Sequence, residues 1–137
     1  MKIVYSYYVL DIIHSGHLLM MKNAKIIAGK DGLSVIGILT DKAVTEKKSK
    51  PTLSLRERMA IAESIKYVDI VVAQDTYSPI TNILTIKPNI LIESDSHNKK
   101  DIENIKIVMN SIGGKIIILP YYPLQSSTQI KKKIKEK

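Results

Sequence analysis

Two of the chain's three histidines stand close together in the tetrad His14-Ser15-Gly16-His17. The tetrad leads directly into a segment with apolar residues at helical spacing, so we expect it at a helix N-terminus. There, free N–H groups and the positive end of the helix dipole attract anions. Imidazoles add hydrogen-bond donors near neutral pH, and Gly16 lets a phosphate approach the backbone closely. The spacing therefore predicts a phosphate-binding site.

The same residues allow two other interpretations. A single histidine at a helix start is most simply a surface residue beside a capped end, but the paired spacing favours an anion site. A metal site built from Asp11, His14 and His17 is the third interpretation. It ranks lowest because no further ligands lie nearby in the sequence and a helix N-terminus disfavours a cation.

Short β-branched runs alternate along the chain with longer segments of helical period, which is the pattern of βαβ units and a mostly parallel sheet. Several of the runs are nearly continuous Ile, Val and Leu, as in strands covered by helices on both faces. We expect strands at residues 1–6, 33–39, 69–73, 89–92 and 115–119. In open sheets of this kind ligands bind beyond the carboxyl ends of the strands, so the chemistry is expected in the segments that follow them.

Five helices are expected between and after these strands. Each shows apolar residues at helical spacing or a recognisable end signal, such as a capping box, a first-turn proline or a closing glycine. The signals are Met20, Ala24 and Ile27 before Gly29; Ser54 and Glu57 before Met59 and Ala62; Ser78-Pro79; Ile102, Ile105 and Met109 before Gly113-Gly114; and Ser126 before Ile130 and Ile134.

The composition bounds the class of protein. With 137 residues, 45% hydrophobic and 25% charged, the chain is expected to form a single domain, residues 1–137, with an aliphatic core. It has no cysteine, which excludes disulfides and thiolate metal sites. The start lacks the features of a signal peptide, and no apolar run approaches the roughly 20 residues that span a bilayer. We therefore expect a cytoplasmic protein without a membrane partner.

The tetrad resembles the HxGH signature of the nucleotidylyltransferase superfamily, and Asp11 stands where the cytidylyltransferase branch has its aspartate. Segments 37–42, 56–58, 65–69 and 87–88 resemble glycerol-phosphate and phosphonate cytidylyltransferases in the same order. Ser126-Ser127-Thr128 resembles the second family signature, at the start of the last helix. The resemblance implies an α/β fold, three-layer and Rossmann-like (HUP-type), with a mostly parallel five-stranded sheet.

The resemblance also implies the reaction and its residues. A nucleoside monophosphate, most simply CMP from CTP, moves to a phosphate or phosphonate of a small metabolite, and pyrophosphate leaves. Such chemistry depends on positioning and charge stabilisation rather than on a protein nucleophile. Mg²⁺ is expected with the triphosphate, held mostly by nucleotide oxygens and water, and a homodimer is expected from the family. The implied roles are catalysis for His14, His17 and Lys47; nucleotide binding for Asp11, Gly16, Ser126, Ser127 and Thr128; and contact with the acceptor or a phosphate for Arg58 and His97. Lys48 or Lys50 could replace Lys47.

The chain departs from the family pattern at several positions. Tyr8 replaces a glycine, segment 94–97 replaces Gly-Asp-Asp-Trp, and Tyr121 and Leu124 replace an arginine and a glycine. Losing that arginine removes a bidentate contact that tyrosine does not replace with charge.

These departures leave two alternatives to CMP transfer. One is an adenylyltransferase that uses ATP, for example with a sugar phosphate as in lipopolysaccharide core precursor synthesis; the other is a degenerate, noncatalytic nucleotide-binding module. The net charge of +8 would also suit nucleic acid. That interpretation leaves the paired histidines unexplained, so no nucleic-acid partner is expected.

Overall fold

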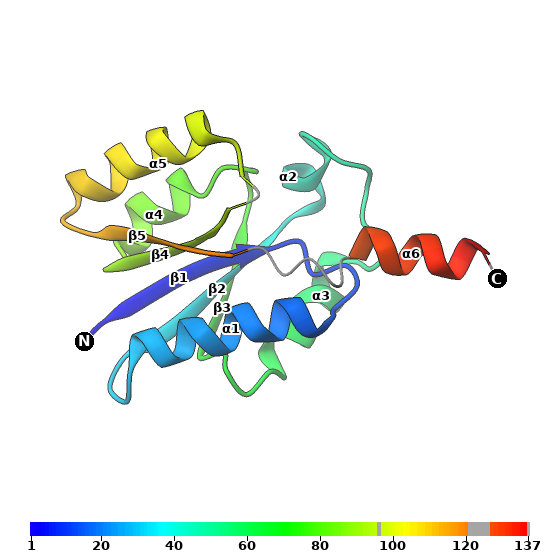
Figure 1. The fold of residues 1–137 in the computed structure, drawn as a ribbon, viewed down its shortest axis with the longest axis horizontal. Coiled ribbons are helices and arrows are strands. Elements are labelled where there is room, and N and C mark those ends of the chain that lie inside the picture. The colour runs from blue at the N-terminus through cyan, green and yellow to red at the C-terminus, as the bar shows by residue number, and fades with distance from the viewer. Residues whose placement is uncertain (96, 121–126, 137) are drawn as a thin grey trace.

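A five-stranded sheet, in the order β3-β2-β1-β4-β5, forms the centre of the molecule (Figure 1). The computed structural model describes residues 1–95, 97–120 and 127–136, with residues 127–131 described by their backbone alone. Every strand pairing in this part of the chain is parallel, which confirms the predicted sheet. The strands are β1 (Ile3–Tyr8), β2 (Leu33–Leu39), β3 (Ile70–Gln74), β4 (Ile90–Ser94) and β5 (Lys115–Leu119).

Helices cover both faces of the sheet and complete three layers (Figure 1). One core cluster joins Tyr5 and Val35 of the sheet to Ile83 of α4 and Met109 of α5, and two others pack the opposite face against α1 and α3. The alternation of side chains along each strand supplies both faces. The helices are α1 (Ser15–Ala28), α2 (Asp41–Thr45), α3 (Leu55–Glu63), α4 (Ile80–Ile86), α5 (Lys99–Ser111) and α6 (Ser127–Glu136).

Most of the expected helix ends are confirmed. Helix α1 closes at Gly29, whose φ of 78° is readily adopted only by glycine, and the capping box of Ser54 and Glu57 is formed at α3. Helix α2 was not predicted. It is a single short turn capped by the Thr40 side chain, too short to produce a helical period. The expected cap at Ser126 lies outside the described residues.

Two strands run two residues further toward their carboxyl ends than the sequence suggested, and β3 runs one residue further, to Gln74. β1 extends to Tyr8, which pairs with Ile38, and β4 extends to Ser94, which pairs with Leu119. Pairing with the neighbouring strands keeps these residues in the sheet. The extensions place Tyr7, Tyr8 and Glu93 at the edge where ligands are expected.

The chain order reverses between β1 and β4. From β1 the sheet grows outward through β2 and β3, and then returns to place β4 on the other side of β1. Such a reversal opens a crevice at the carboxyl ends of the two strands, and this is the usual ligand site of open α/β sheets. Helix α6 lies beyond that end of the sheet (Figure 1).

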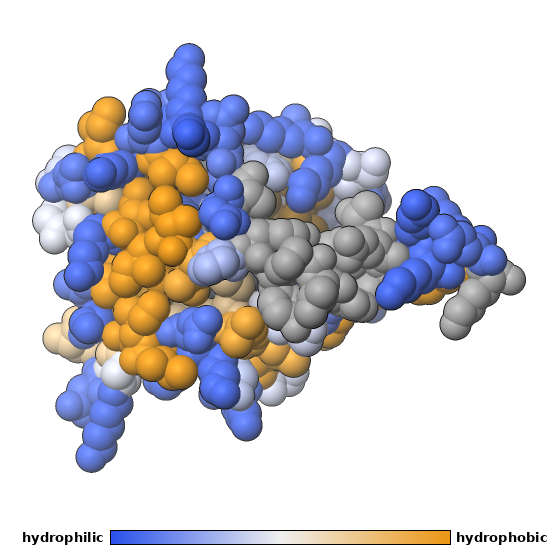
Figure 2. Space-filling model, in the orientation of Figure 1, coloured by the Kyte–Doolittle hydropathy of each residue, from blue (hydrophilic) through white to orange (hydrophobic). Residues whose placement is uncertain are grey.

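The far edge of the sheet has a different surface. Figure 2 shows an apolar area between α5 and α1, where the edge strand β5 lies, and Ile118 of this strand is 50% exposed. In the described part of the chain, no helix is long and apolar enough to cross a membrane.

Candidate active site

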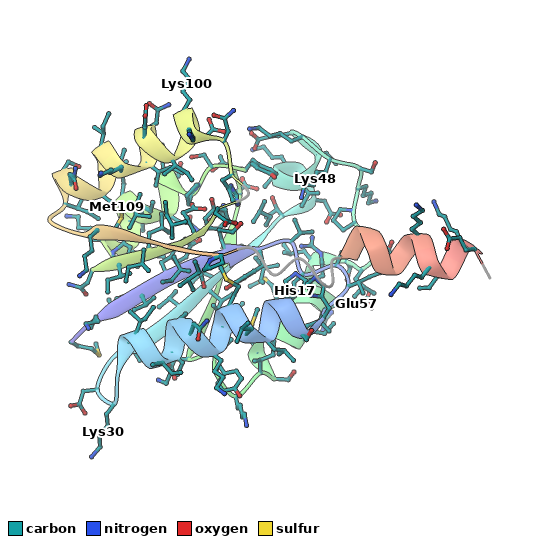
Figure 3. All side chains as sticks on the ribbon, in the orientation of Figure 1. His17, Lys30, Lys48, Glu57, Lys100 and Met109 are labelled. Atoms are coloured by element: carbon teal, nitrogen blue, oxygen red, sulfur yellow. The ribbon has the colours of Figure 1, made fainter. Side chains whose placement is uncertain are left out.

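A cavity of about 800 Å³ opens at the carboxyl ends of β1 and β4, where the sheet order reverses. Its wall comes from the end of β1, the loop into α1 and the first turn of α1, together with residues 48–51 after α2 and the segment that follows β4. His14 and His17 both line it. Figure 3 shows His17 at the start of α1 and Lys48 on the segment after α2.

The two histidine rings are fixed by the backbone of the α1 N-terminus. Nδ1 of His14 accepts a hydrogen bond from the Gly16 N–H at 3.0 Å, and Nδ1 of His17 accepts from the His14 N–H at 3.2 Å. The ring centroids are 3.9 Å apart. Because both Nδ1 atoms act as acceptors, the hydrogen of each neutral ring must sit on Nε2, on the side of the ring away from these backbone contacts.

The surroundings favour the neutral form of both rings. Burial lowers the pKa of His14, and burial together with the neighbouring His14 lowers the pKa of His17 to about 4. The positive end of the helix dipole acts in the same direction. At pH 7 the pair therefore offers two Nε2–H donors to the cavity, without the charge repulsion that two imidazolium ions would bring.

Tyr8 contributes to this burial. Its ring meets the His17 ring edge to face, with centroids 6.0 Å apart and an interplanar angle of 83°. Tyr8 is one of the positions at which the sequence departs from the family pattern, where a glycine is expected. Its side chain therefore fills space in the cavity wall and shields His17 from water.

The lysine-rich segment after α2, residues 47–50, contains three lysines that differ in their position relative to the cavity. Lys48 and Lys50 line the cavity, whereas Lys47 is not one of its lining residues. The Lys47 Nζ lies 3.6 Å from Asp101 of α5 and 5.0 Å from the centroid of the Tyr77 ring. The catalytic role of Lys47 stays a prediction, and the open alternatives, Lys48 and Lys50, are the lysines that line the cavity.

Arg58 has a structural position instead of the predicted contact with the acceptor. Its side chain is fully buried, and its guanidinium donates to the carbonyl oxygens of Leu53, Val9 and Leu39 at 2.6–3.1 Å and to Asp41 at 2.8 Å. These bonds join the ends of β1 and β2 to the segment before α3. Arg58 holds the cavity wall from behind and does not line it.

Asp11 and Gly16 lie in the cavity wall, and both make contacts that order it. The Asp11 carboxylate accepts the backbone N–H groups of Thr52 and Leu53 at 3.0 and 2.8 Å, which ties the lysine-rich segment to the β1–α1 loop. Gly16 is buried and its N–H is already bound to the His14 ring. Its amide is therefore already engaged within the start of the helix.

The segment at the end of β4 brings in a group that sequence reasoning missed. Glu93 is 2% exposed, lines the cavity, and accepts a hydrogen bond from the Tyr7 hydroxyl at 2.6 Å. Its Oε2 lies 3.7 Å from Nε2 of His97. Burial raises the pKa of Glu93 to about 7, against the lowering effect of the Tyr7 hydrogen bond. A carboxylate directly after the apolar run 90–92 was the available signal.

His97, the predicted acceptor contact, does lie in the cavity wall. Its ring is edge to face with Tyr7, at 6.1 Å between centroids. Burial and the nearby charge of Lys48 lower the pKa of His97, so this ring too is neutral near pH 7. Ser126 and the side chains of Ser127 and Thr128 lie outside the described residues, while the backbone of the latter two opens α6.

The described side chains include no group of three or more potential metal ligands. Asp11, the carboxylate nearest in sequence to the histidine pair, is bound to two backbone N–H groups. This wall fits a Mg²⁺ ion that arrives with a triphosphate and keeps mostly phosphate and water ligands, which is the usual mode of Mg²⁺ in nucleotide sites.

An open parallel sheet with a histidine pair at the first helix and lysines beside it is suited to binding a phosphate chain, and the chain belongs to the cytidylyltransferase-like family, whose model matches residues 9–133. The described fold is thus that of a cytidylyltransferase-like domain. Among its relatives is the bifunctional protein HldE of Gluconobacter oxydans, 27% identical over 94% of this chain but only 26% of that protein. The chain thus spans about a quarter of the length of these bifunctional relatives.

A second group of relatives, the FAD synthases, consists of proteins that this chain matches over most of their own length. The FAD synthase of Korarchaeum cryptofilum is 30% identical over 90% of this chain and 85% of that protein. A solved structure, the lipopolysaccharide core biosynthesis protein of Thermoplasma volcanium, superimposes with a TM-score of 0.74 at 22% identity, over 91% of this chain and 99% of that one. At this identity the superposition establishes the fold alone.

Proposed function

We propose that the protein transfers AMP from ATP to the phosphate of a small metabolite and releases pyrophosphate. The observation that carries the proposal is the pair of fixed Nε2–H donors of His14 and His17, at a helix N-terminus in a cavity shared with Lys48 and Lys50. Hydrogen-bond donors, a helix dipole and ammonium groups are together suited to the phosphate chain of a nucleoside triphosphate.

In this reaction an oxygen of the acceptor phosphate attacks the α-phosphorus of ATP. A new P–O bond forms, the bond between the α-phosphorus and the bridging oxygen breaks, and pyrophosphate carries away the electron pair. The acceptor phosphate is already ionised, so no protein base has to remove a proton. His14 and His17 donate hydrogen bonds to phosphate oxygens as their charge increases, and Lys48 and Lys50 neutralise the pyrophosphate.

Divalent metal ions are generally used by enzymes of this family. A Mg²⁺ bound with the triphosphate would neutralise part of its charge. Asp11 keeps the lysine-rich segment close to the histidine pair through its bonds to Thr52 and Leu53. Binding of phosphate oxygens by Ser126, Ser127 and Thr128 stays a prediction, as do the single domain and the homodimer.

The choice of ATP over CTP rests on the relatives. FAD consists of AMP joined to FMN, so an FAD synthase forms its product by joining an AMP unit to a phosphate, and these are the relatives that the chain matches over most of their length. CMP transfer, the first prediction from the sequence, is the second candidate, and it is favoured by the description of the family.

A pyrophosphate-release screen tests the proposal. ATP and CTP are each combined with FMN, glycerol 3-phosphate, several sugar phosphates and a phosphonate. For the productive pair we expect His14→Ala and His17→Ala each to lower kcat/KM by about 10²–10³-fold, the usual effect of removing a donor to developing charge. Lys30→Ala, beyond the opposite end of α1 (Figure 3), is the matched control and should leave the rate unchanged.

Three outcomes would contradict parts of this account. Rates unchanged in both histidine variants would remove the site assignment. Pyrophosphate release with CTP but not with ATP would support nucleotidyl transfer but show that the nucleotide substrate is CTP. Tight binding of either triphosphate with no release for any acceptor would favour the noncatalytic module.

A further inference from the structure

Glu93 is a buried carboxyl group in the cavity wall that the proposed reaction does not use. It sits at the end of β4, next to β1 and thus next to the strand that leads into the histidine pair. Placing a carboxyl group at 2% exposure costs desolvation energy. Residues with such surroundings in a cleft are frequent at functional sites.

Two neighbours define what Glu93 can bind. Tyr7 of β1 donates its hydroxyl hydrogen to Oε1 at 2.6 Å, and the His97 ring stands 3.7 Å from Oε2. We call Tyr7, Glu93 and His97 the Glu93 cluster. All three residues line the same cavity as His14 and His17, so a substrate held at the histidine pair by its phosphate can extend toward this cluster.

The cluster can both accept and donate hydrogen bonds. A carboxylate has about four acceptor directions, and a protonated carboxyl group also donates. Because burial raises the pKa of Glu93 to about 7, both forms are populated near neutral pH. The Tyr7 hydroxyl oxygen is a further acceptor. Groups that donate and accept at once, above all hydroxyl groups, match this combination.

Charge argues against the two other common acceptor headgroups. An ammonium group would meet one carboxyl group that is ionised only in part near neutral pH, and it would share the cavity with Lys48 and Lys50, which repel it. A second phosphate beside Glu93 would meet the carboxylate in a poorly solvated place. A neutral hydroxyl group meets neither penalty.

We propose that Glu93 and Tyr7, with His97 beside them, form a subsite that recognises hydroxyl groups of the acceptor. The inference rests on the proposed function, because it takes the acceptor's phosphate to lie at the histidine pair. Glu93 is then a specificity-determining residue: it selects a polyol or sugar phosphate over a phosphate of the same size without hydroxyl groups.

The experiment measures pyrophosphate release by the full chain with matched acceptors. One pair is glycerol 3-phosphate and propyl phosphate; a second is ribose 5-phosphate and pentyl phosphate; ethanolamine phosphate represents the ammonium class. In at least one pair, the wild type should use the hydroxylated member with a kcat/KM at least about tenfold higher, the effect of a hydrogen bond to a charged group. Glu93→Leu should reduce this ratio to below about threefold.

Controls separate recognition from folding. Glu93→Gln and Tyr7→Phe keep the shape of the cluster and should give ratios between those of the wild type and Glu93→Leu. Each variant should bind ATP with unchanged affinity, which shows that the histidine side is intact. Glu103→Gln, a carboxylate on the exposed side of α5, should keep the wild-type ratio.

The possible failures are distinguishable. Three results, each with pyrophosphate release, would overturn the subsite and leave the proposed function intact. They are a ratio that Glu93→Leu leaves unchanged, equal use of both members in both pairs, and a preference for ethanolamine phosphate. The absence of release from the wild type with every acceptor overturns the proposed function, and the subsite with it.

Discussion

The two sides of the cavity differ in how their groups are brought together. On one side, His14 and His17 are neighbours in sequence, and a single helix turn fixes both rings. On the other side, Tyr7 and Glu93 meet only because β1 and β4 are adjacent in the sheet. The first side is specified by local spacing and the second by long-range pairing. On both sides burial favours the neutral form: it lowers the pKa of the imidazoles and raises that of the carboxyl group.

The largest effect on stability is expected at Arg58, whose buried hydrogen bonds support the cavity wall on the histidine side. Arg58→Met leaves the carbonyls of Val9, Leu39 and Leu53 without their buried partner, so the free energy of unfolding should fall by about 3–5 kcal/mol. Chemical denaturation measures it. Arg56→Met, on the exposed side of the same helix, should change stability by no more than about 0.5 kcal/mol. Equal effects of the two substitutions would refute the supporting role.

A pH titration of stability should reveal the neutral state of His17. Its folded pKa of about 4 lies below the ordinary value of 6.5, so the folded state binds fewer protons between these values. Stability is present above pH 6.5 and is lost as the pH falls toward 4, by about 3 kcal/mol in total. His17→Gln, which can keep the bond to the His14 N–H, should flatten this part of the curve. A curve that coincides with that of the wild type would contradict the lowered pKa.

Glu93 should produce the opposite slope. Its folded pKa of about 7 lies above the ordinary 4.5, so the contribution to stability is present below pH 4.5 and is lost as the pH rises through 7, again by about 3 kcal/mol. The measurement is the unfolding free energy of Glu93→Gln relative to the wild type across this interval. The difference should grow with pH in favour of the variant, and a constant difference would show that the carboxyl group is not held in its neutral form.

The smallest effect is expected for kcat/KM when single lysines of the segment after α2 are replaced. Lys48→Ala and Lys50→Ala should each lower kcat/KM by about tenfold, because each removes one exposed charge near the phosphate chain. Lys47→Ala should change it by less than about twofold, since its ammonium group lies at Asp101 and Tyr77. Steady-state pyrophosphate release at low salt measures all three. A larger loss for Lys47 than for the other two would restore the original preference.

The same contrast explains what the sequence could predict. The sheet, the α1 and α3 caps and the His14–His17 pair depend on local period and spacing, and these expectations match the fold. Lys47 was preferred by its place in the chain, but the direction of a side chain in an irregular segment depends on partners elsewhere, here Asp101.

Long-range contacts account for the other differences. The family resemblance implied a contact of Arg58 with the acceptor or a phosphate, and only the packing of α3 against the ends of β1 and β2 shows that it is buried. Glu93 was missed because β4 was taken to end at Ile92, before the pairing with β5 was known. Residues of this kind are recognisable from sequence only once the neighbouring strands are known.

The most direct test of the account is ¹⁵N NMR of the histidine side chains at pH 7, with His14 and His17 assigned through single substitutions. We expect both rings to be neutral with the hydrogen on Nε2, and both Nε2–H signals to shift when ATP and Mg²⁺ are added. Positively charged rings in the free protein, hydrogens on Nδ1, or signals that do not respond to the nucleotide would contradict it.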